Sequence, residues 1–173
     1  GKMLKKKIEK AFNKQINAEL YSSYLYLSMA ACFNAKNLPG MAQWMRVQAD
    51  EEREHAMKFF HFIEERGGRV ELAAIEAPQK EWKTALEAFE AAYEHETKVT
   101  GMINDLVDLS ISEKDHASNA FLQWFVTEQV EEEANAQGIV DQLKMVGDKG
   151  NGLFMVDREL GKRQPGAEEE GGE

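Results

Sequence analysis

The sequence predicts an all-α domain: a four-helix bundle with one long crossover and a short C-terminal fifth helix. Only three of the 173 residues are proline, and these lie between long segments of good helix formers. No segment alternates apolar and polar residues over a useful length, so no strand is expected except a short candidate at residues 69–72. The connection between the second and third helices is about a dozen residues, which is long enough to run the length of a bundle.

Glycine and proline set the bounds of four long helices, which we expect at about residues 4–36, 40–66, 81–110 and 116–146. The first ends at the segment NLPG, the second ends at Gly67-Gly68, and Pro78 bars a helix in the connection that follows. The segment GDKGNG separates the fourth helix from a short fifth one predicted within residues 153–163. Residues 1–163 then form one domain, and the small, acidic residues 164–173 form a disordered tail.

Charge and cysteine content exclude several classes of protein. The net charge is −10, with 31 acidic and 21 basic residues, so we expect no nucleic-acid partner, which would need clustered Lys and Arg. The single cysteine, Cys32, cannot form an intramolecular disulfide, and nothing in the sequence indicates secretion. No apolar run is long enough to span a bilayer. We therefore expect a cytoplasmic protein with no membrane partner.

The second predicted helix turns charged residues toward the core. Successive side chains of a helix are about 100° apart, which places Glu52 in the middle of the apolar stripe and His55 on its edge, one turn along. Arg53 and Glu54 lie on the opposite, solvated side. Glu51 lies between the two regions, so its angle fits either a peripheral ligand or a surface acid.

Each of the other three helices also carries an acid in its apolar stripe. Glu19 interrupts the stripe of the first helix, Glu96 that of the third, and Glu132 and Glu128 that of the fourth, with Gln129 at its border. Glu19, Glu96 and Glu132 lie near the middle of their helices, as Glu52 does. Antiparallel packing would therefore bring four carboxylates to one level of the bundle.

Four buried carboxylates repel one another, and burying even one without a partner costs several kcal/mol. Protons or cations could relieve this, and four carboxylates with one imidazole match two divalent ions almost charge for charge. Mixed oxygen and nitrogen ligands suit iron or manganese, and also zinc. A single glutamate on an apolar face is more often an interface residue than a ligand, but one per helix at a common level is hard to obtain that way. Glu113 and His116 have the spacing of Glu52 and His55, yet they lie at a predicted turn, where we expect solvated side chains.

Four segments carry a resemblance to a known family: NAELYSSYLYLSMA, EEREHAMKF, AYEHE and FLQWFVTEQVEEE. In this order they resemble the non-haem ferritins of bacteria and archaea, and the similarity extends over nearly the whole chain. The resemblance implies a ferritin-like bundle, assembled as a hollow homo-oligomeric shell of 24 subunits. It also implies oxidation of Fe(II) by O2 and storage of ferric oxyhydroxide inside the shell.

The same resemblance implies the ligands of a two-iron ferroxidase centre. Glu19, Glu52 and His55 would bind the first iron, and Glu52 would bridge to a second iron held by Glu96 and Glu132. Gln129 lies nearby, and Tyr26 and Trp124 match aromatic residues beside the centre that could donate an electron. A third, weaker iron site is implied at Glu51, Glu128 and Glu131, sharing Glu132.

Departures from related families narrow the expectation. The fourth helix has no second Glu-x-x-His, which separates the chain from haem-containing bacterioferritins, so no haem is expected. One cysteine cannot build a rubredoxin-type iron site, which disfavours a rubrerythrin-like peroxidase. A non-storage diiron oxidase or peroxidase and a purely structural helical assembly remain the alternatives. Tyr21, Tyr24 and Leu25 lie off the core stripe of the first helix, which predicts a subunit contact.

Overall fold

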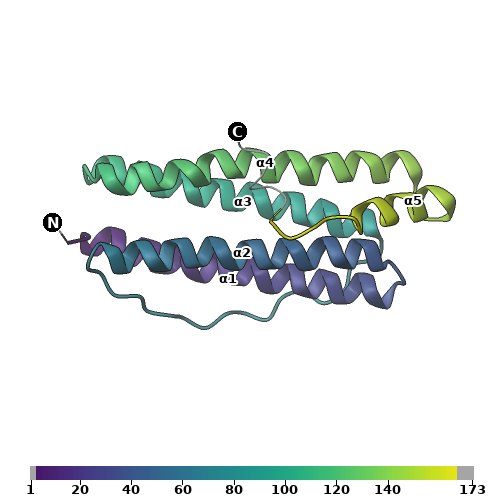
Figure 1. The fold of residues 1–173 in the computed structure, drawn as a ribbon, viewed down its shortest axis with the longest axis horizontal. Helices are drawn as coiled ribbons and strands as arrows, with labels where there is room; N and C mark the ends of the chain where they lie inside the picture. The colour runs from purple at the N-terminus through teal and green to yellow at the C-terminus, as the bar shows by residue number, and fades with distance from the viewer. Residues whose placement is uncertain (1–2, 167–173) are drawn as a thin grey trace.

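The computed structural model describes residues 3–166, and these contain five α-helices and no strand. The helices are α1 (Lys6–Ala35), α2 (Pro39–Glu65), α3 (Ala85–Ser112), α4 (His116–Val146) and α5 (Gly150–Leu160). Figure 1 shows α1 beside α2 and α3 beside α4, with residues 66–84 running along the outside from one end of the bundle to the other. The predicted four-helix bundle, long crossover and fifth helix are therefore confirmed, whereas the strand considered at residues 69–72 is absent.

Two helix starts differ from the prediction. The third helix begins at Ala85 rather than near residue 81, because Thr84 has an extended backbone and its hydroxyl accepts a hydrogen bond from the Glu87 N–H at 3.1 Å. The fifth helix begins at Gly150, so the last three residues of GDKGNG are already helical. Most of the predicted acidic tail, residues 167–173, lies outside the described residues.

The buried apolar side chains form two clusters, one toward each end of the bundle. In one cluster the rings of Phe12, Phe59 and Phe125 meet, with centroids 5.2 Å apart for Phe12–Phe59 and 4.5 Å apart for Phe59–Phe125. In the other, Phe33 stacks on Phe89 at 5.4 Å. Between the clusters lies a layer of buried polar side chains, which is the candidate site.

Three predictions about individual apolar residues are wrong. Leu27 and Trp124 fall within the apolar stripes of the first and fourth helices, a pattern that predicts burial, but they are 45% and 38% exposed. Leu25, assigned to an exposed contact face, is buried in the core. For the two α1 residues, Leu25 and Leu27, the reason is that α1 packs against both α2 and α3, so its buried sector is wider than one stripe and displaced from the expected one.

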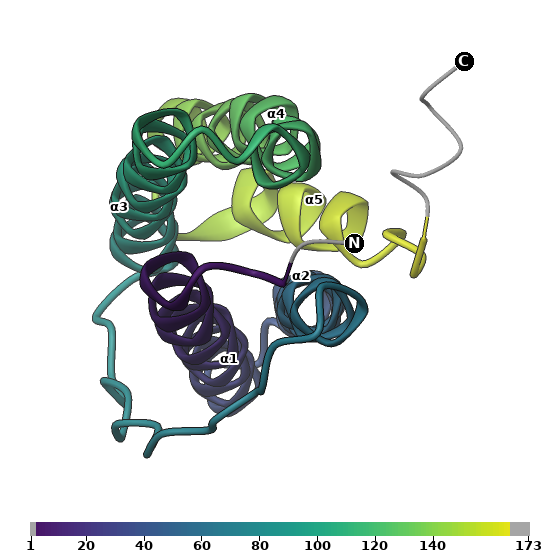
Figure 2. The ribbon, with the colours of Figure 1, turned by 90° about the vertical axis from the view of Figure 1, so that its left-hand side faces the viewer.

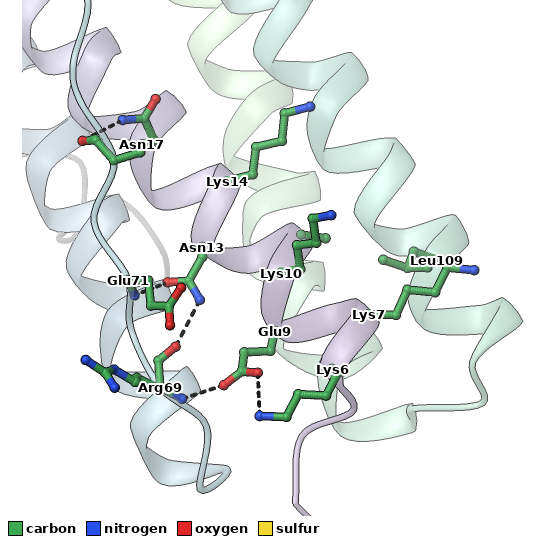
Figure 3. Close-up of a pocket in the computed structure, with 12 residues that line it drawn as sticks. Lys6, Lys7, Glu9, Lys10, Asn13, Lys14, Asn17, Arg69, Glu71 and Leu109 are labelled. Carbon is green, nitrogen blue, oxygen red and sulfur yellow. Dashed lines mark hydrogen bonds and ion pairs between the residues drawn. The ribbon is translucent and has the colours of Figure 1, made fainter.

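The crossover keeps its extended path because side chains of α1 bind its backbone. Glu9, Asn13 and Asn17 recur every four residues and so share one face of α1 (Figure 3). The Glu9 carboxylate accepts from the Arg69 N–H at 2.6 Å, while the Asn13 amide donates to the Arg69 carbonyl at 2.9 Å and accepts from the Glu71 N–H at 2.8 Å. These bonds satisfy backbone groups that no strand or helix would satisfy here.

Helix α5 lies between α4 and α2 (Figure 2), and it docks onto the first turn of α2. Leu38 offers no side-chain cap to α2, and the carboxylate of Asp157, from α5, accepts the Met41 N–H at 2.8 Å instead. The backbones touch at Gly40, where an added Cβ would lie 1.7 Å from the Asp157 carbonyl oxygen. Only glycine permits this approach.

The turn between α3 and α4 contains a buried acid, contrary to the prediction that its charged residues are solvated. Asp115 is 8% exposed, and its carboxylate caps α4 by accepting the Ser118 N–H at 3.0 Å. Both terminal nitrogens of Arg66 donate to the same carboxylate, at 3.0 and 3.1 Å. Burial opposes ionisation of Asp115, but these hydrogen bonds outweigh it and hold the pKa of the carboxyl below its usual value.

Replacing Asp115 with alanine is expected to lower the free energy of unfolding of the metal-free protein by about 2–3 kcal/mol. The change removes the N-cap of α4 and leaves the Arg66 guanidinium without its carboxylate partner. Because the pKa of Asp115 is lowered in the fold, its contribution is present above about pH 3.8 and is lost as the pH falls through the folded value. Denaturant titration at pH 7 and at pH 3 measures both effects. D108A, at an exposed aspartate of α3, is the control, and equal stability of the two variants would contradict the assignment.

Candidate metal centre

Each long helix contributes one glutamate to the polar layer between the two apolar clusters. The five inward ionisable residues, each at most 4% exposed, are Glu19, Glu52, His55, Glu96 and Glu132. The structure thus brings together the carboxylates that the helical pattern placed at one level. Because these residues are buried, solvent cannot screen the repulsion between their carboxylates, and a proton, a cation or a neighbouring side chain has to compensate it.

Glu19, Glu52 and His55 form the first group. His55 Nδ1 lies 3.3 Å from Glu52 Oε2 and 3.8 Å from Glu19 Oε2, and all three atoms are buried. None of the three makes a hydrogen bond within residues 3–166. Buried polar atoms that face one another without hydrogen bonds are rare in folded proteins and call for an explanation such as a bound ion.

Glu52, Glu96 and Glu132 form the second group, in which one carboxylate oxygen from each residue lies within 4.8 Å of the others. Glu52 belongs to both groups. Its Oε2 lies 3.3 Å from His55 Nδ1, and the carboxylate also lies within reach of Glu96 and Glu132, so it stands between two possible cation positions.

The residues expected for a third site are dispersed. Glu128 lies within 4.8 Å of His55 and Glu132, counted between ligand atoms. The Glu51 carboxylate instead pairs with Arg163 at 2.9 Å, and Glu131 is exposed on α4. Among the described residues, neither Glu51 nor Glu131 belongs to a cluster of three or more possible metal ligands. Glu131 points away because it is about 100° from Glu132 on the same helix.

Glutamines hold the carboxylates in place, a feature that the sequence prediction missed. Gln15 donates to Glu19 Oε1 at 3.1 Å, and Gln48 donates to Glu52 Oε1 at 3.0 Å. Gln48 also donates to Glu132 Oε2 at 2.7 Å. In both helices a buried glutamine lies four residues before the glutamate, a spacing that brings the two side chains together and could have revealed the pairs.

Gln129 and Tyr26 hold the fourth carboxylate. The Gln129 amide lies 3.2 Å from Glu96 Oε2 and, although predicted at the border of its stripe, is buried. The Tyr26 hydroxyl donates to Glu96 Oε1. Burial, with the charge of Glu96, raises the pKa of Tyr26 well above its usual value, so the phenol keeps its proton and remains a donor.

Trp124 connects the first group to the surface. Its ring meets the His55 ring edge to face, with centroids 5.2 Å apart, and the Lys58 ammonium lies 3.8 Å from the Trp124 ring centroid. The remaining histidines stay outside the groups. His95 is 2.7 Å from the Ser22 hydroxyl, and His61 and His116 are on the surface.

Without a cation, protons neutralise part of the centre. Burial, reinforced by the charge of Glu96, raises the pKa of Glu52 well above its usual value, and burial raises that of Glu96. Burial by itself would lower the pKa of His55, but the neighbouring carboxylates of Glu52 and Glu19 outweigh burial and raise it. Burial by itself would raise the pKa of Glu19, but His55 outweighs burial and lowers it. Cations that displace these protons would make binding dependent on pH.

The donor set fits divalent cations. Four carboxylates and one imidazole supply oxygen and nitrogen ligands of the kind preferred by iron, manganese and zinc. Two groups that share Glu52 provide for two ions rather than one. The surrounding amides and phenol satisfy the outer oxygens, as is usual around ligands in metal sites.

The described part of the chain has no helix with the length and apolar character needed to cross a membrane. Residues 9–146 match the family described as Ferritin-like domain. A bacterial non-heme ferritin of Bacteroides fragilis is 45% identical over 161 residues, which cover 93% of this chain and 100% of the relative. The corresponding Campylobacter jejuni protein is 42% identical over 156 residues, which cover 90% of this chain and 93% of the relative.

A solved structure of the Archaeoglobus fulgidus ferritin, described as an open-pore ferritin, superimposes with a TM-score of 0.92. It is 53% identical, over 93% of this chain and 99% of that one. The fold, the buried carboxylate layer and these similarities agree with the resemblance carried by the four sequence segments. The chain therefore belongs to the ferritin family, within the non-haem ferritins of bacteria and archaea.

Proposed function

We propose that this protein stores iron and oxidises it, taking up Fe(II), oxidising it with O2 at the buried centre and keeping ferric oxyhydroxide inside a hollow shell. The observation that carries the proposal is the convergence of Glu19 Oε2, Glu52 Oε2 and His55 Nδ1, which are buried and make no hydrogen bond within the described chain. Membership of the ferritin family supports iron as the cation.

The shared carboxylate explains how the centre would work. Glu52 lies in both groups, so it would hold two ferrous ions close enough for both to react with one O2. Each iron loses one electron and dioxygen gains two. Carboxylates stabilise ferric more than ferrous iron, which favours oxidation, while a single histidine leaves the product free to move on to the mineral.

Neighbouring residues would tune this reaction. Gln129 would orient Glu96, and Tyr26, which donates to the same carboxylate, would supply a further electron. Glu128, which lies within 4.8 Å of His55 and Glu132, would contribute to a third, weaker iron position, and Glu51 and Glu131 would have to turn toward it to take part. Glu51 would have to leave Arg163 before it could bind iron there.

Storage also requires a shell, and we propose a homo-oligomer of 24 subunits in the cytoplasm. Tyr24 and Leu27 expose 49% and 45% of their surface on α1. Apolar side chains gathered on one helix face are typical of a subunit contact.

Aerobic addition of Fe(II) to the metal-free protein tests the proposal. We expect ferric absorbance to develop faster than in buffer, and electron microscopy of the loaded particles to show a shell filled with mineral. Oxidation no faster than in buffer would contradict the ferroxidase function. Rapid oxidation by a dimer without mineral would indicate a non-storage diiron oxidase instead.

A further inference from the structure

Arg163, which follows the end of α5, reaches back to the middle of α2. Its Nη1 donates to the Trp44 carbonyl at 3.2 Å and to Gln48 Oε1 at 2.9 Å, and its Nη2 pairs with Glu51 Oε2 at 2.9 Å. The guanidinium carbon also lies 4.4 Å from the Trp44 ring centroid. Because the side chain is only 11% exposed, these contacts fix the guanidinium in one place.

Gln48 connects Arg163 to the metal centre. Its carbonyl accepts from Arg163, and its NH2 group donates to Glu52 Oε1 at 3.0 Å and to Glu132 Oε2 at 2.7 Å. If the amide rotated by 180°, its oxygen would face two carboxylate oxygens and its NH2 group would face the guanidinium. Both ends would then be mismatched, so Arg163 favours the orientation in which Gln48 donates to the centre.

The charge of Arg163 also strengthens this connection. A hydrogen bond from a guanidinium polarises the amide that accepts it, and a polarised amide donates more strongly from its NH2 group. Glu52 and Glu132 both belong to the second carboxylate group, and Glu52 is shared with the first. Stronger donation from Gln48 therefore holds two ligand carboxylates of the centre in fixed positions.

The position of Arg163 depends on the docking of α5. Asp157 anchors that helix at Met41, and Gly40 allows its backbone to approach α2. From there Arg163 reaches Trp44, Gln48 and Glu51, which lie on successive turns of the same helix. The docked α5 and the buried carboxylates are thus joined by one chain of contacts.

We propose that Arg163 is a positioning residue of the metal centre: by fixing and polarising the Gln48 amide, it raises the affinity of Glu52 and Glu132 for divalent cations. This rests on the proposed function of the centre as a cation site. The inference assigns a role to the segment after α5, which lies outside the four helices that supply the ligands.

Calorimetric titration of the assembled, metal-free protein with Zn(II) tests this without iron oxidation. R163M is expected to lower Zn(II) affinity about tenfold, the size of effect usual for residues that hold metal ligands. K162M is the matched control, because Lys162 is adjacent, is exposed and pairs with the exposed Glu159 rather than with a residue of the centre. We expect its affinity to equal that of the wild type.

A double-mutant cycle separates positioning from general stability. In a Q48L background, R163M should change Zn(II) affinity by less than about twofold, since the amide that transmits its effect is gone. A merely structural role would lower affinity by the same factor in both backgrounds and would overturn the inference. If R163M does not assemble, R163K serves in the same cycle, because a single ammonium cannot reproduce the fixed arrangement in which Nη1 binds Gln48 and Nη2 binds Glu51.

The outcomes also separate this inference from the function on which it rests. A wild-type protein that does not bind Zn(II) would overturn both. A wild-type protein that binds Zn(II) and an R163M variant that binds it equally well would overturn the role of Arg163 alone.

Discussion

Replacing Glu52 with glutamine is expected to slow Fe(II) oxidation by more than about 100-fold, while raising the thermal stability of the metal-free protein. Residues that only support metal ligands change affinity or activity by about 10–100-fold, and Glu52 is a shared member of both ligand groups. On the proposed function, its loss would separate the two proposed iron positions, so that two electrons could no longer be delivered together to one O2.

The gain in stability has a different cause. Burial and the charge of Glu96 raise the pKa of Glu52 well above its usual value of 4.5. A carboxyl whose pKa is raised in the fold contributes stability that is fully present below about pH 4.5 and is lost as the pH rises through the folded value. Glutamine keeps the shape of the protonated acid and does not ionise, so the E52Q variant escapes this loss.

Two measurements check these expectations. Stopped-flow absorbance gives the oxidation rate, and thermal unfolding of metal-free protein from pH 4.5 to pH 8 gives the stability difference, which should grow with pH. E54Q changes an exposed glutamate two residues away and should alter neither quantity. Oxidation by E52Q within tenfold of the wild-type rate would show that Glu52 does not bridge two irons.

Replacing Gly40 with alanine is expected to undock α5 and to destabilise the protein by about 3 kcal/mol or more, the range of severe overpacking. The new Cβ would lie 1.7 Å from the Asp157 carbonyl oxygen and 3.0 Å from the Gly161 nitrogen. Both are backbone atoms, so no side-chain movement can make room. Undocking would expose Val156 and Leu160 and withdraw Arg163 from the centre.

Thermal unfolding and limited trypsin digestion measure the G40A effect. We expect a lower melting temperature and rapid cleavage after Arg158 and Arg163, because α5 would no longer protect them. G101A is the control, since nothing lies within 4 Å of the added Cβ and alanine is the better residue inside a helix. Equal stability of G40A and G101A would show that the contact between α2 and α5 is not required.

The helical pattern predicted those features of the site that can be read from a single helix. Glu19, Glu52, Glu96 and Glu132 could be placed because a carboxylate within an apolar stripe turns inward whatever its neighbours are. The contacts of Gln48 with Glu132 and of Arg163 with Gln48 could not be predicted in this way, since they join residues 84 and 115 positions apart in the sequence. Asp115 was misjudged for the same reason, as its partner Arg66 lies 49 residues away in the sequence, directly after the end of α2.

Glu51 shows that a family resemblance does not determine the environment of each individual residue. Its angle on α2 left both a peripheral ligand and a surface acid open, and only the family resemblance favoured the ligand. The structure gives it a third environment, an ion pair with Arg163 that is about nine-tenths buried. The sequence of α2 alone could not predict this ion pair, because its partner Arg163 follows the last helix.

The polar layer between the two apolar clusters also determines how the helices align lengthwise. Sliding one helix by a single turn, about 5.4 Å, would move its glutamate out of the layer and among apolar side chains. A buried carboxylate without partners costs several kcal/mol, so each such slip is penalised, although the apolar stripes alone would tolerate it. The four carboxylates thus specify one lengthwise alignment of the helices before any metal is bound.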